Sequence, residues 1–183
     1  MKFISTPLEG LLIIEPKVFL DERGFFYESF NESLMIEHGI KGPFIQDNQS
    51  VSHKNVLRGL HFQVPPHQQG KLIRVVNGSV LDIVVDIRKN SPSYGKHFSL
   101  ELNARENKML WIPEGFAHGF IALEDHTVFL YKVTQYYNPA SESGIIYNDS
   151  ELNLDWKNKA PLVSPKDKIL QTFKEFSDQK VIM

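Results

Sequence analysis

Polar side chains interrupt four apolar, strand-like segments of this sequence. They are Gln46, Asn48 and Ser50 in FIQDNQSVS, Arg58 and His61 in VLRGLHFQ, Lys71 in KLIRVV, and Tyr131, Tyr136 and Tyr137 in FLYKVTQYY. In the first segment the polar residues recur at every second position, so they share one face of a strand. Amide, guanidinium, imidazole, ammonium and phenol groups are the types that hold a polar ligand by hydrogen bonds and charge.

Taken one at a time, none of these positions predicts a site. A single histidine or arginine on a strand is more often solvated or structurally hydrogen-bonded, and a tyrosine in VFLYKV is most often a core residue. A closed barrel changes this interpretation, because inward-facing polar residues from several strands converge and their burial is costly. We therefore predict that these side chains line one ligand-binding cavity.

A metal centre is the alternative to this interpretation. The segment WIPEGFAHGF is similar to the second cupin motif, with Pro113, Gly115 and His118 in the matching positions. The first cupin motif needs two histidines one residue apart and a following glutamate, and only His61 is present. Lys71 stands where an acidic ligand would be expected, and its ammonium opposes a divalent cation. The sequence therefore predicts a cupin-like barrel with no metal site.

Most of the chain has the pattern of short strands separated by turns, which is typical of a barrel or jelly roll. Strands are predicted over residues 11–19, 24–30, 44–52, 56–63, 71–76, 79–88, 97–102, 108–113, 118–123 and 127–134. The Asn-Gly pair at 77–78 lies between two of these strands and predicts a tight hairpin. The predicted fold class is all-β, a cupin-type jelly-roll barrel with short peripheral helices.

Two short helices are predicted outside the strands. Asn31 is a suitable N-cap for a helix that ends at Gly39. Apolar residues near the C-terminus have helical spacing and predict a second helix over about residues 165–176.

Composition excludes several classes of protein. The chain has 183 residues, 42% of them hydrophobic and 23% charged, which is ordinary for one globular domain. Its net charge of −2 argues against a nucleic-acid partner. No cysteine is present, so disulfides and thiolate sites are excluded, and a cytoplasmic location fits. No apolar run is long enough for a secretory signal or a membrane span.

Several separated motifs together identify a family. RGLHFQ, QGKLIRVVNGSVLDIVVDIRKNSPSYG, LWIPEGFAHGF, FLYKVTQYYNP and SPKD, with the upstream DERGFFYESF and FIQDNQSVS, closely resemble the dTDP-4-dehydrorhamnose 3,5-epimerases. The resemblance runs in one register from about residue 5 to residue 168. It implies inversion at C3 and C5 of dTDP-4-dehydro-6-deoxy-D-glucose, giving dTDP-4-dehydro-L-rhamnose, with no metal or organic cofactor.

The resemblance also implies an organisation for the chain. The epimerase domain spans residues 1–183, with a barrel core at about 44–150. The N-terminal strands, within 1–30, are exchanged between the subunits of a homodimer. The segment 151–183 folds back over the barrel.

Functional residues carry over by their place in these motifs. His61 corresponds to the catalytic base, Asp167 to its dyad partner, Tyr131 to the acid on the opposite face, and Lys71 to the group that stabilises the enolate. The positions that correspond to substrate contacts are Arg23, Phe26, Glu28, Gln46, Asn48, Arg58, His118, Tyr137, Glu142 and Lys166. Arg23, Phe26 and Glu28 belong to the exchanged strands and so reach the neighbouring subunit's site, while Tyr137 stacks on thymine.

Three alternatives stay open at this point. The first is an enzyme that inverts only one carbon or acts on another nucleotide-linked 4-keto sugar. Residue types cannot decide between these reactions, because the pose of the sugar determines which carbons are inverted. A cupin that only binds a sugar nucleotide is a second alternative, and the filled positions His61, Lys71, Tyr131 and Asp167 argue against it. A metal-dependent cupin enzyme is the third, and the incomplete first motif argues against that.

Overall fold

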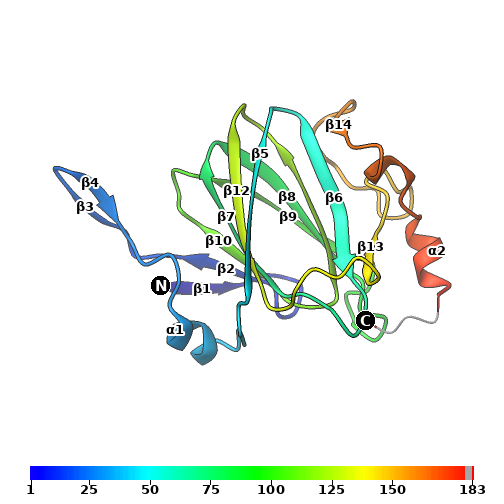
Figure 1. The fold of residues 1–183 in the computed structure, drawn as a ribbon, viewed down its shortest axis with the longest axis horizontal. Coiled ribbons are helices and arrows are strands. Elements are labelled where there is room, and N and C mark those ends of the chain that lie inside the picture. The colour runs from blue at the N-terminus through cyan, green and yellow to red at the C-terminus, as the bar shows by residue number, and fades with distance from the viewer. Residues whose placement is uncertain (180–182) are drawn as a thin grey trace.

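Two β-sheets packed face to face form the body of the computed structural model, which describes residues 1–179 and 183 (Figure 1). The first sheet contains, in spatial order, β1 (Lys2–Ser5), β2 (Leu12–Glu15), β10 (Met109–Ile112), β7 (Lys71–Asn77), β12 (Thr127–Val133) and β5 (Gln46–Ser52). The second contains β13 (Glu142–Gly144), β6 (Val56–Gln63), β11 (Phe116–Ala122), β8 (Ser79–Asp86) and β9 (His97–Asn103). A short strand, β14 (Leu162–Val163), pairs in parallel with β6. These sheets confirm the predicted all-β jelly-roll barrel.

The alternation of side chains along each strand divides the apolar residues between the inside and the outside of the barrel. On β8, Val80 and Val84 point into the core between the sheets, whereas Ile83 and Val85 belong to a separate cluster behind the second sheet. A third cluster, which includes Met35 of the N-terminal helix, lies behind the first sheet. The central strands β8, β10 and β11 are therefore buried on both faces, which explains why they are so continuously apolar, whereas the edge strands β5 and β9 have alternate exposed positions.

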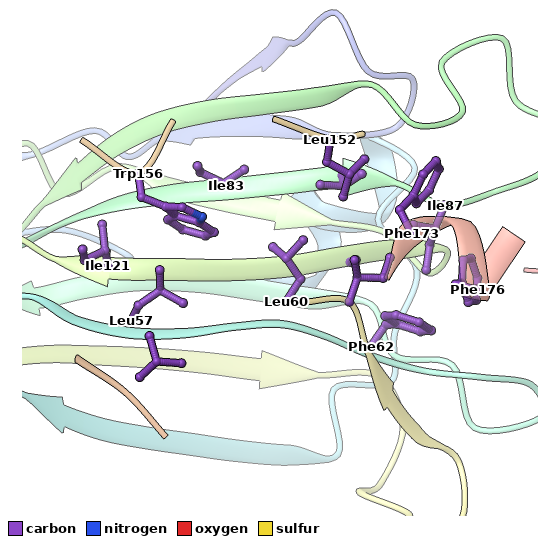
Figure 2. Close-up of a cluster of buried hydrophobic side chains, with 14 residues drawn as sticks. Leu57, Leu60, Phe62, Ile83, Ile87, Ile121, Leu152, Trp156, Phe173 and Phe176 are labelled. Atoms are coloured by element: carbon purple, nitrogen blue, oxygen red, sulfur yellow. The ribbon is translucent and has the colours of Figure 1, made fainter. Parts of the chain in front are cut away.

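The C-terminal part of the chain covers the outer face of the second sheet. Leu57, Leu60 and Phe62 of β6 point outward and pack with Trp156 and Phe176 from the last segment (Figure 2). Burying side chains of this size contributes about 1.5–3 kcal/mol each. This packing fixes the course of the chain after β14 and brings its residues beside the end of the barrel.

The Asn-Gly pair does not form the predicted hairpin. Strands β7 and β8 flank it but belong to different sheets, so they do not pair with each other. Gly78 has a φ of 77°, and a Cβ there would lie 2.4 Å from Thr127 Oγ1. The local signal for a left-handed turn is correct, but the turn passes the chain from one sheet to the other.

The predicted C-terminal helix over 165–176 is also wrong in extent. The segment forms a 3-10 turn, η1 (Asp167–Ile169), and then a separate helix, α2 (Phe173–Ser177), capped by Thr172. Leu170 between them is extended, with ψ at 154°, and Ile169 is 84% exposed. The apolar spacing therefore reflects two elements packed independently, because tertiary contacts decide where so short a helix begins.

After β2, residues 19–37 form elements that lie outside the two sheets. Helix α1 (Glu32–Glu37) begins as predicted, with Asn31 accepting a hydrogen bond from the Leu34 N–H at 3.2 Å. Strands β3 (Phe19–Asp21) and β4 (Gly24–Phe26) form a hairpin that projects from the body (Figure 1). The strand predicted over 11–19 is divided between β2 and β3, and the strand predicted over 24–30 ends at Phe26.

No helix of the described residues has the length and apolar character needed to cross a membrane.

Candidate active site

A cavity of about 620 Å³ lies between the two sheets, where the strands carry polar instead of apolar inward side chains. Nine of the fourteen residues expected to form the site line it, namely Arg58, His61, Lys71, His118, Tyr131, Tyr137, Glu142, Lys166 and Asp167. They come from both sheets, from the loop after β12 and from the segment after β14. The fold therefore gathers side chains that are up to 109 positions apart in the sequence, from Arg58 to Asp167.

A β-bulge allows Arg58 and His61 to face the same cavity. Three positions apart on a regular strand, they would point to opposite faces. The pairing of β6 with β11 shifts by one residue at Gly59, so that His61 lies opposite His118 and Arg58 opposite Phe120. A Cβ on Gly59 would lie 2.5 Å from the backbone of Gly119, so only glycine fits where the strands approach most closely.

His61 forms a dyad with Asp167 at the second sheet. Its Nε2 lies 2.8 Å from Asp167 Oδ1, and the Gly59 N–H donates to Oδ2 at 3.3 Å. Asp167 is 4% exposed, and burial alone would raise its pKa, but the hydrogen bond and charge of His61 and the Gly59 N–H hold that pKa below its usual value. The ionised carboxylate fixes the imidazole with Nε2 toward Asp167, so Nδ1 is the nitrogen left for a ligand.

Lys71 crosses the cavity from the first sheet toward the same strand. Its Nζ donates to the His61 carbonyl oxygen at 3.2 Å, and the residue is buried. Burial lowers the pKa of Lys71 to about 8, while the negative charge of Asp82 acts in the opposite direction. The side chain is therefore a desolvated ammonium with few partners, which suits it to stabilise an anion in the cavity.

Tyr131 lines the opposite wall of the cavity from His61. It belongs to β12 of the first sheet, whereas His61 belongs to β6 of the second. Burial raises the pKa of the Tyr131 phenol, and the charge of Arg58 only partly offsets this. The hydroxyl is therefore protonated at neutral pH and can donate a proton from the face opposite His61.

His118 is the second histidine of the cavity and has its own carboxylate. Its Nε2 lies 2.8 Å from Asp82 Oδ2, and both residues are buried. Two histidines on the adjacent strands β6 and β11 thus face the cavity, each held by a carboxylate, His61 by Asp167 and His118 by Asp82.

A cluster of charged and aromatic groups lies at the mouth of the cavity. Glu142 Oε2 accepts hydrogen bonds from the Tyr137 hydroxyl at 2.7 Å and from Lys166 Nζ at 2.6 Å. Burial of Glu142 tends to raise its pKa, but Lys166 and Tyr137 hold that pKa below its usual value. The ring of Tyr137 is half exposed, so its face is available to a flat ligand.

Gln46 and Asn48 lie beside the cavity instead of lining it. Both are on the inner face of β5, where Asn48 lies opposite Tyr131 in the pairing with β12. Gln46 accepts a hydrogen bond from the Tyr137 N–H at 3.1 Å and donates to Asn48 at 2.9 Å. Their contacts within this chain therefore hold the loop that carries Tyr137.

Arg23, Phe26 and Glu28 are not brought to this cavity. The first two belong to the projecting β3–β4 hairpin, and Glu28 follows it. All three are exposed, and Arg23 pairs with the neighbouring Asp21. Within one chain the fold separates these residues from the rest of the expected site.

The donor groups of the cavity do not suit a metal ion. Within residues 1–179 and 183, no three histidine, aspartate or glutamate side chains are grouped as metal ligands. His61 and His118 each direct Nε2 to a carboxylate, and Lys71 places a cation beside them. The expectation that no metal or organic cofactor is needed stays a prediction.

Sequence reasoning missed two buried polar residues of the site. Asp82 interrupts the apolar run of β8 at a position that alternates with Val80 and Val84 and therefore faces inward. A charged residue at such a position is the signal by which it could have been found. Gln63 on β6 donates to the Tyr136 carbonyl at 3.2 Å and accepts from the Asn138 N–H at 2.7 Å. It therefore holds the loop of Tyr137 from the side opposite Gln46.

Comparisons with known proteins agree with this geometry. The family model described as dTDP-4-dehydrorhamnose 3,5-epimerase matches residues 5–175. The chain is 51% identical to the dTDP-4-dehydrorhamnose 3,5-epimerase of Escherichia coli K12 over 185 residues, covering 100% of both chains. The crystal structure of the enzyme of the same name from Elizabethkingia anophelis superposes with a TM-score of 0.92 at 45% identity, covering 96% of this chain and 97% of that one.

A solved structure with a bound sugar nucleotide is also similar. It is the 3,5-epimerase from Legionella pneumophila in complex with dTDP-4-keto-L-rhamnose, and it superposes with a TM-score of 0.91 at 46% identity. The alignment covers 94% of this chain and 93% of that one.

Proposed function

The chain belongs to the dTDP-4-dehydrorhamnose 3,5-epimerase family and is an isomerase of nucleotide-linked sugars, and on this premise we propose its substrate and the role of each site residue. The proposed substrate is dTDP-4-dehydro-6-deoxy-D-glucose, and the product is dTDP-4-dehydro-L-rhamnose, formed by inversion at C3 and C5. A related enzyme solved with dTDP-4-keto-L-rhamnose supports this choice.

The chemistry of the substrate defines what the cavity must do. C3 and C5 both flank the C4 ketone, so loss of a proton from either carbon leaves an enolate with its charge on the C4 oxygen. Inversion needs one group that takes the proton and another that returns a proton to the opposite face. The placement of His61 and Tyr131 on facing sheets is the observation that carries the proposal.

His61 is the proposed base. Its Nε2 is directed to Asp167 at 2.8 Å, which leaves the lone pair of Nδ1 for the substrate proton. As the imidazole takes up that proton it becomes positive, and the adjacent carboxylate stabilises the charge, as in a catalytic triad. The Gly59 N–H donates to the other carboxylate oxygen and so favours this orientation of Asp167.

Lys71 and Tyr131 complete the proposed mechanism. A Lys71 pKa of about 8 leaves most of this side chain charged near pH 7, where it stabilises the enolate oxygen as a point charge. Because the pKa of Tyr131 is raised, its hydroxyl stays protonated near pH 7 and can donate a proton to C5 of the enolate.

The mouth of the cavity is proposed to hold the nucleotide. The exposed face of Tyr137 is placed to stack on thymine, and Lys166 and Arg58 supply positive charge for the diphosphate. Glu142 holds Tyr137 and Lys166 together at the rim. Charge concentrated here explains how a chain with a net charge of −2 can bind a dianion.

We further propose a homodimer in which the β3–β4 hairpin of one subunit completes the cavity of the other. The hairpin is short, projects from the body and exposes large apolar side chains, with Leu20 at 80% and Phe26 at 67% exposure (Figure 1). An isolated two-stranded hairpin is marginally stable alone, so it needs a partner surface. This arrangement would return Arg23, Phe26 and Glu28 to an active site.

Mixing two inactive variants tests the shared site. An Arg23→Ala chain has an intact cavity, and a His61→Asn chain has an intact hairpin. After subunits are mixed and exchanged, a mixed dimer contains one complete site, so activity should return to roughly a quarter of the wild-type level if exchange is random. Failure of the mixed sample to gain activity, with exchange verified by mass, would contradict the shared site.

Proton NMR of the protein with dTDP-4-dehydro-6-deoxy-D-glucose in deuterated water tests the reaction itself. Deuterium at both C3 and C5, with appearance of the L-sugar, is the expected result. Exchange at one carbon alone would reassign the protein as a single-centre epimerase. Absence of exchange would refute the proposed substrate, and nucleotide-linked heptoses would be tested next.

Activity should be unaffected by chelators, because no metal is expected in the site. The cytoplasmic location stays a prediction.

A further inference from the structure

Asp82 is a buried carboxylate that the proposed mechanism does not use. It is 1% exposed and points inward from β8 into the polar end of the barrel. Its Oδ2 accepts the hydrogen bond from His118 Nε2, whereas Oδ1 is buried and has no hydrogen-bond partner among the described residues. Leaving a buried carboxylate oxygen without a donor is costly, so its negative charge requires an explanation.

The ammonium of Lys71 provides that explanation, because Lys71 lines the same cavity as His118, the histidine to which Asp82 is hydrogen-bonded. Lys71 is buried, and its side chain donates a hydrogen bond to a neutral group, the carbonyl oxygen of His61, at 3.2 Å. Burial lowers the pKa of Lys71 to about 8, and the charge of Asp82 is the influence that raises it. A cation with so little hydrogen bonding depends on through-space attraction to remain protonated.

Other charged groups around the cavity have partners of their own. Asp167 is engaged by His61 and Gly59, and Glu142 is engaged by Lys166 and Tyr137. Arg58 is a cation, so its charge disfavours a second cation nearby. The titratable groups that line the cavity with Lys71 are Arg58, His61, His118, Tyr131 and Asp167 and, at its mouth, Tyr137, Glu142 and Lys166.

We propose that Asp82 is a positioning residue that keeps Lys71 in its ammonium form and holds His118 with Nδ1 directed to the substrate. One carboxylate thereby serves two neighbours: Oδ2 orients the imidazole by a hydrogen bond, and the net charge acts on the ammonium. The effect on turnover rests on the proposed function, because it requires that Lys71 stabilises the enolate. The effect on the protonation of Lys71 does not.

The consequence for the enzyme is a defined upper limit of its pH range. Lys71 supports the reaction in its charged form, so activity should be full below its pKa and fall as the pH rises through about 8. Removal of the negative charge of Asp82 lowers that pKa further, so the fall in activity moves to lower pH. A residue that merely filled space would lower activity equally at every pH.

An NMR titration of the lysine ε-carbons tests the inference without any need for turnover. The protein is labelled with ¹³C at this position, and the Lys71 signal is identified by its absence in Lys71→Arg. The wild-type midpoint is expected near 8. In Asp82→Asn, which keeps an oxygen for His118 but has no charge, the midpoint should fall by about one pH unit.

Two further variants keep the result interpretable. Glu101→Gln removes an exposed carboxylate from the adjacent strand β9 and should leave the Lys71 midpoint unchanged. Asp82→Ser also removes the charge and is titrated alongside Asp82→Asn, so that poor folding of one variant does not decide the outcome. An unchanged midpoint in a folded Asp82 variant, or a wild-type midpoint above about 10, refutes the inference.

The pH–rate profile then links protonation to catalysis. A midpoint shift of about one unit makes Asp82→Asn roughly fivefold slower than wild type near pH 8 but nearly equal near pH 6. A loss of the same size at both pH values contradicts the proposed role of Lys71, even where the NMR midpoint moves. The two measurements thus separate failure of this inference from failure of the proposed mechanism.

Discussion

Replacing Asp167 by asparagine tests the dyad most directly. Each oxygen of the carboxylate accepts from a donor, Oδ1 from His61 Nε2 at 2.8 Å and Oδ2 from the Gly59 N–H at 3.3 Å. Asparagine has one acceptor oxygen, so it cannot satisfy both donors. If its oxygen faces Gly59, its NH₂ group faces His61 and forces Nε2 to become the acceptor. The ring proton then moves to Nδ1, which blocks the nitrogen that should take the substrate proton.

The size of the effect follows from the bond that is lost. A hydrogen bond to a charged group contributes about 1.5–3 kcal/mol, which corresponds to roughly 10- to 150-fold in rate. We therefore expect kcat of Asp167→Asn to fall by about this factor, with the blocked tautomer making the loss larger still. Binding of dTDP should change little, because Asp167 contacts the histidine and not the mouth of the cavity.

The assay is solvent deuterium incorporation at C3 and C5 at saturating substrate, with dTDP binding measured by calorimetry. Asp155→Asn is the matched control, because this carboxylate is exposed and, among the residues that the structure describes, forms an ion pair with Lys157 alone. It should retain wild-type activity. A folded Asp167→Asn protein with kcat within about twofold of wild type would show that the carboxylate does not support the base.

Three further predictions follow from the geometry. Tyr131→Phe should retain deuterium exchange but lose inversion at C5 by about 10²-fold or more, and full product formation would refute the role of the phenol as acid. Burial tends to raise the pKa of Asp86, but Arg88 and two serine hydroxyls hold it below its usual value. Asp86 therefore stabilises the fold at pH values above its unfolded-state pKa of about 4, and this contribution is lost as the pH falls through its lower folded-state pKa. The free energy of unfolding of Asp86→Asn in urea should depend less on pH below about 4 than that of the wild type. Parallel plots of this free energy against pH for the two proteins would contradict the prediction. Gly78 has a φ of 77°, and a Cβ at this position would lie 2.4 Å from Thr127 Oγ1. The free energy of unfolding of Gly78→Ala should therefore fall by about 1–3 kcal/mol, and an unchanged urea midpoint would refute the steric argument.

The strands of the barrel could be predicted because their signal is local. On β8, Val80 and Val84 face the barrel interior and Ile83 and Val85 face the packed outer side, so apolar residues on both faces make the strand evident without knowledge of its partners. The N-cap of α1 is equally local, since Asn31 and the amide that it accepts are three residues apart. The motifs around His61, Lys71 and Tyr131 likewise identified the family, because residue types in order are a property of the sequence.

Pairing of strands could not be predicted in the same way. The Asn-Gly pair at 77–78 correctly indicated a left-handed turn, yet its flanking strands entered different sheets. A turn residue determines the local dihedral angles, whereas the sheet that a strand joins depends on the partners available across the whole barrel. The helix expected over 165–176 failed for a related reason, because packing against β6 and β13 divided the segment into two short elements.

The active site depends most on tertiary structure. The sequence by itself determined which chemical groups are available, because each residue type has an intrinsic charge, donor set and proton affinity. Only the fold determined that Arg58 and His61 share a face, through the bulge at Gly59, and that Asp167 meets His61 from 106 positions away. Only burial determined that Lys71 has a pKa of about 8, because desolvation and the field of Asp82 depend on where the chain places the ammonium and not on its neighbours in sequence.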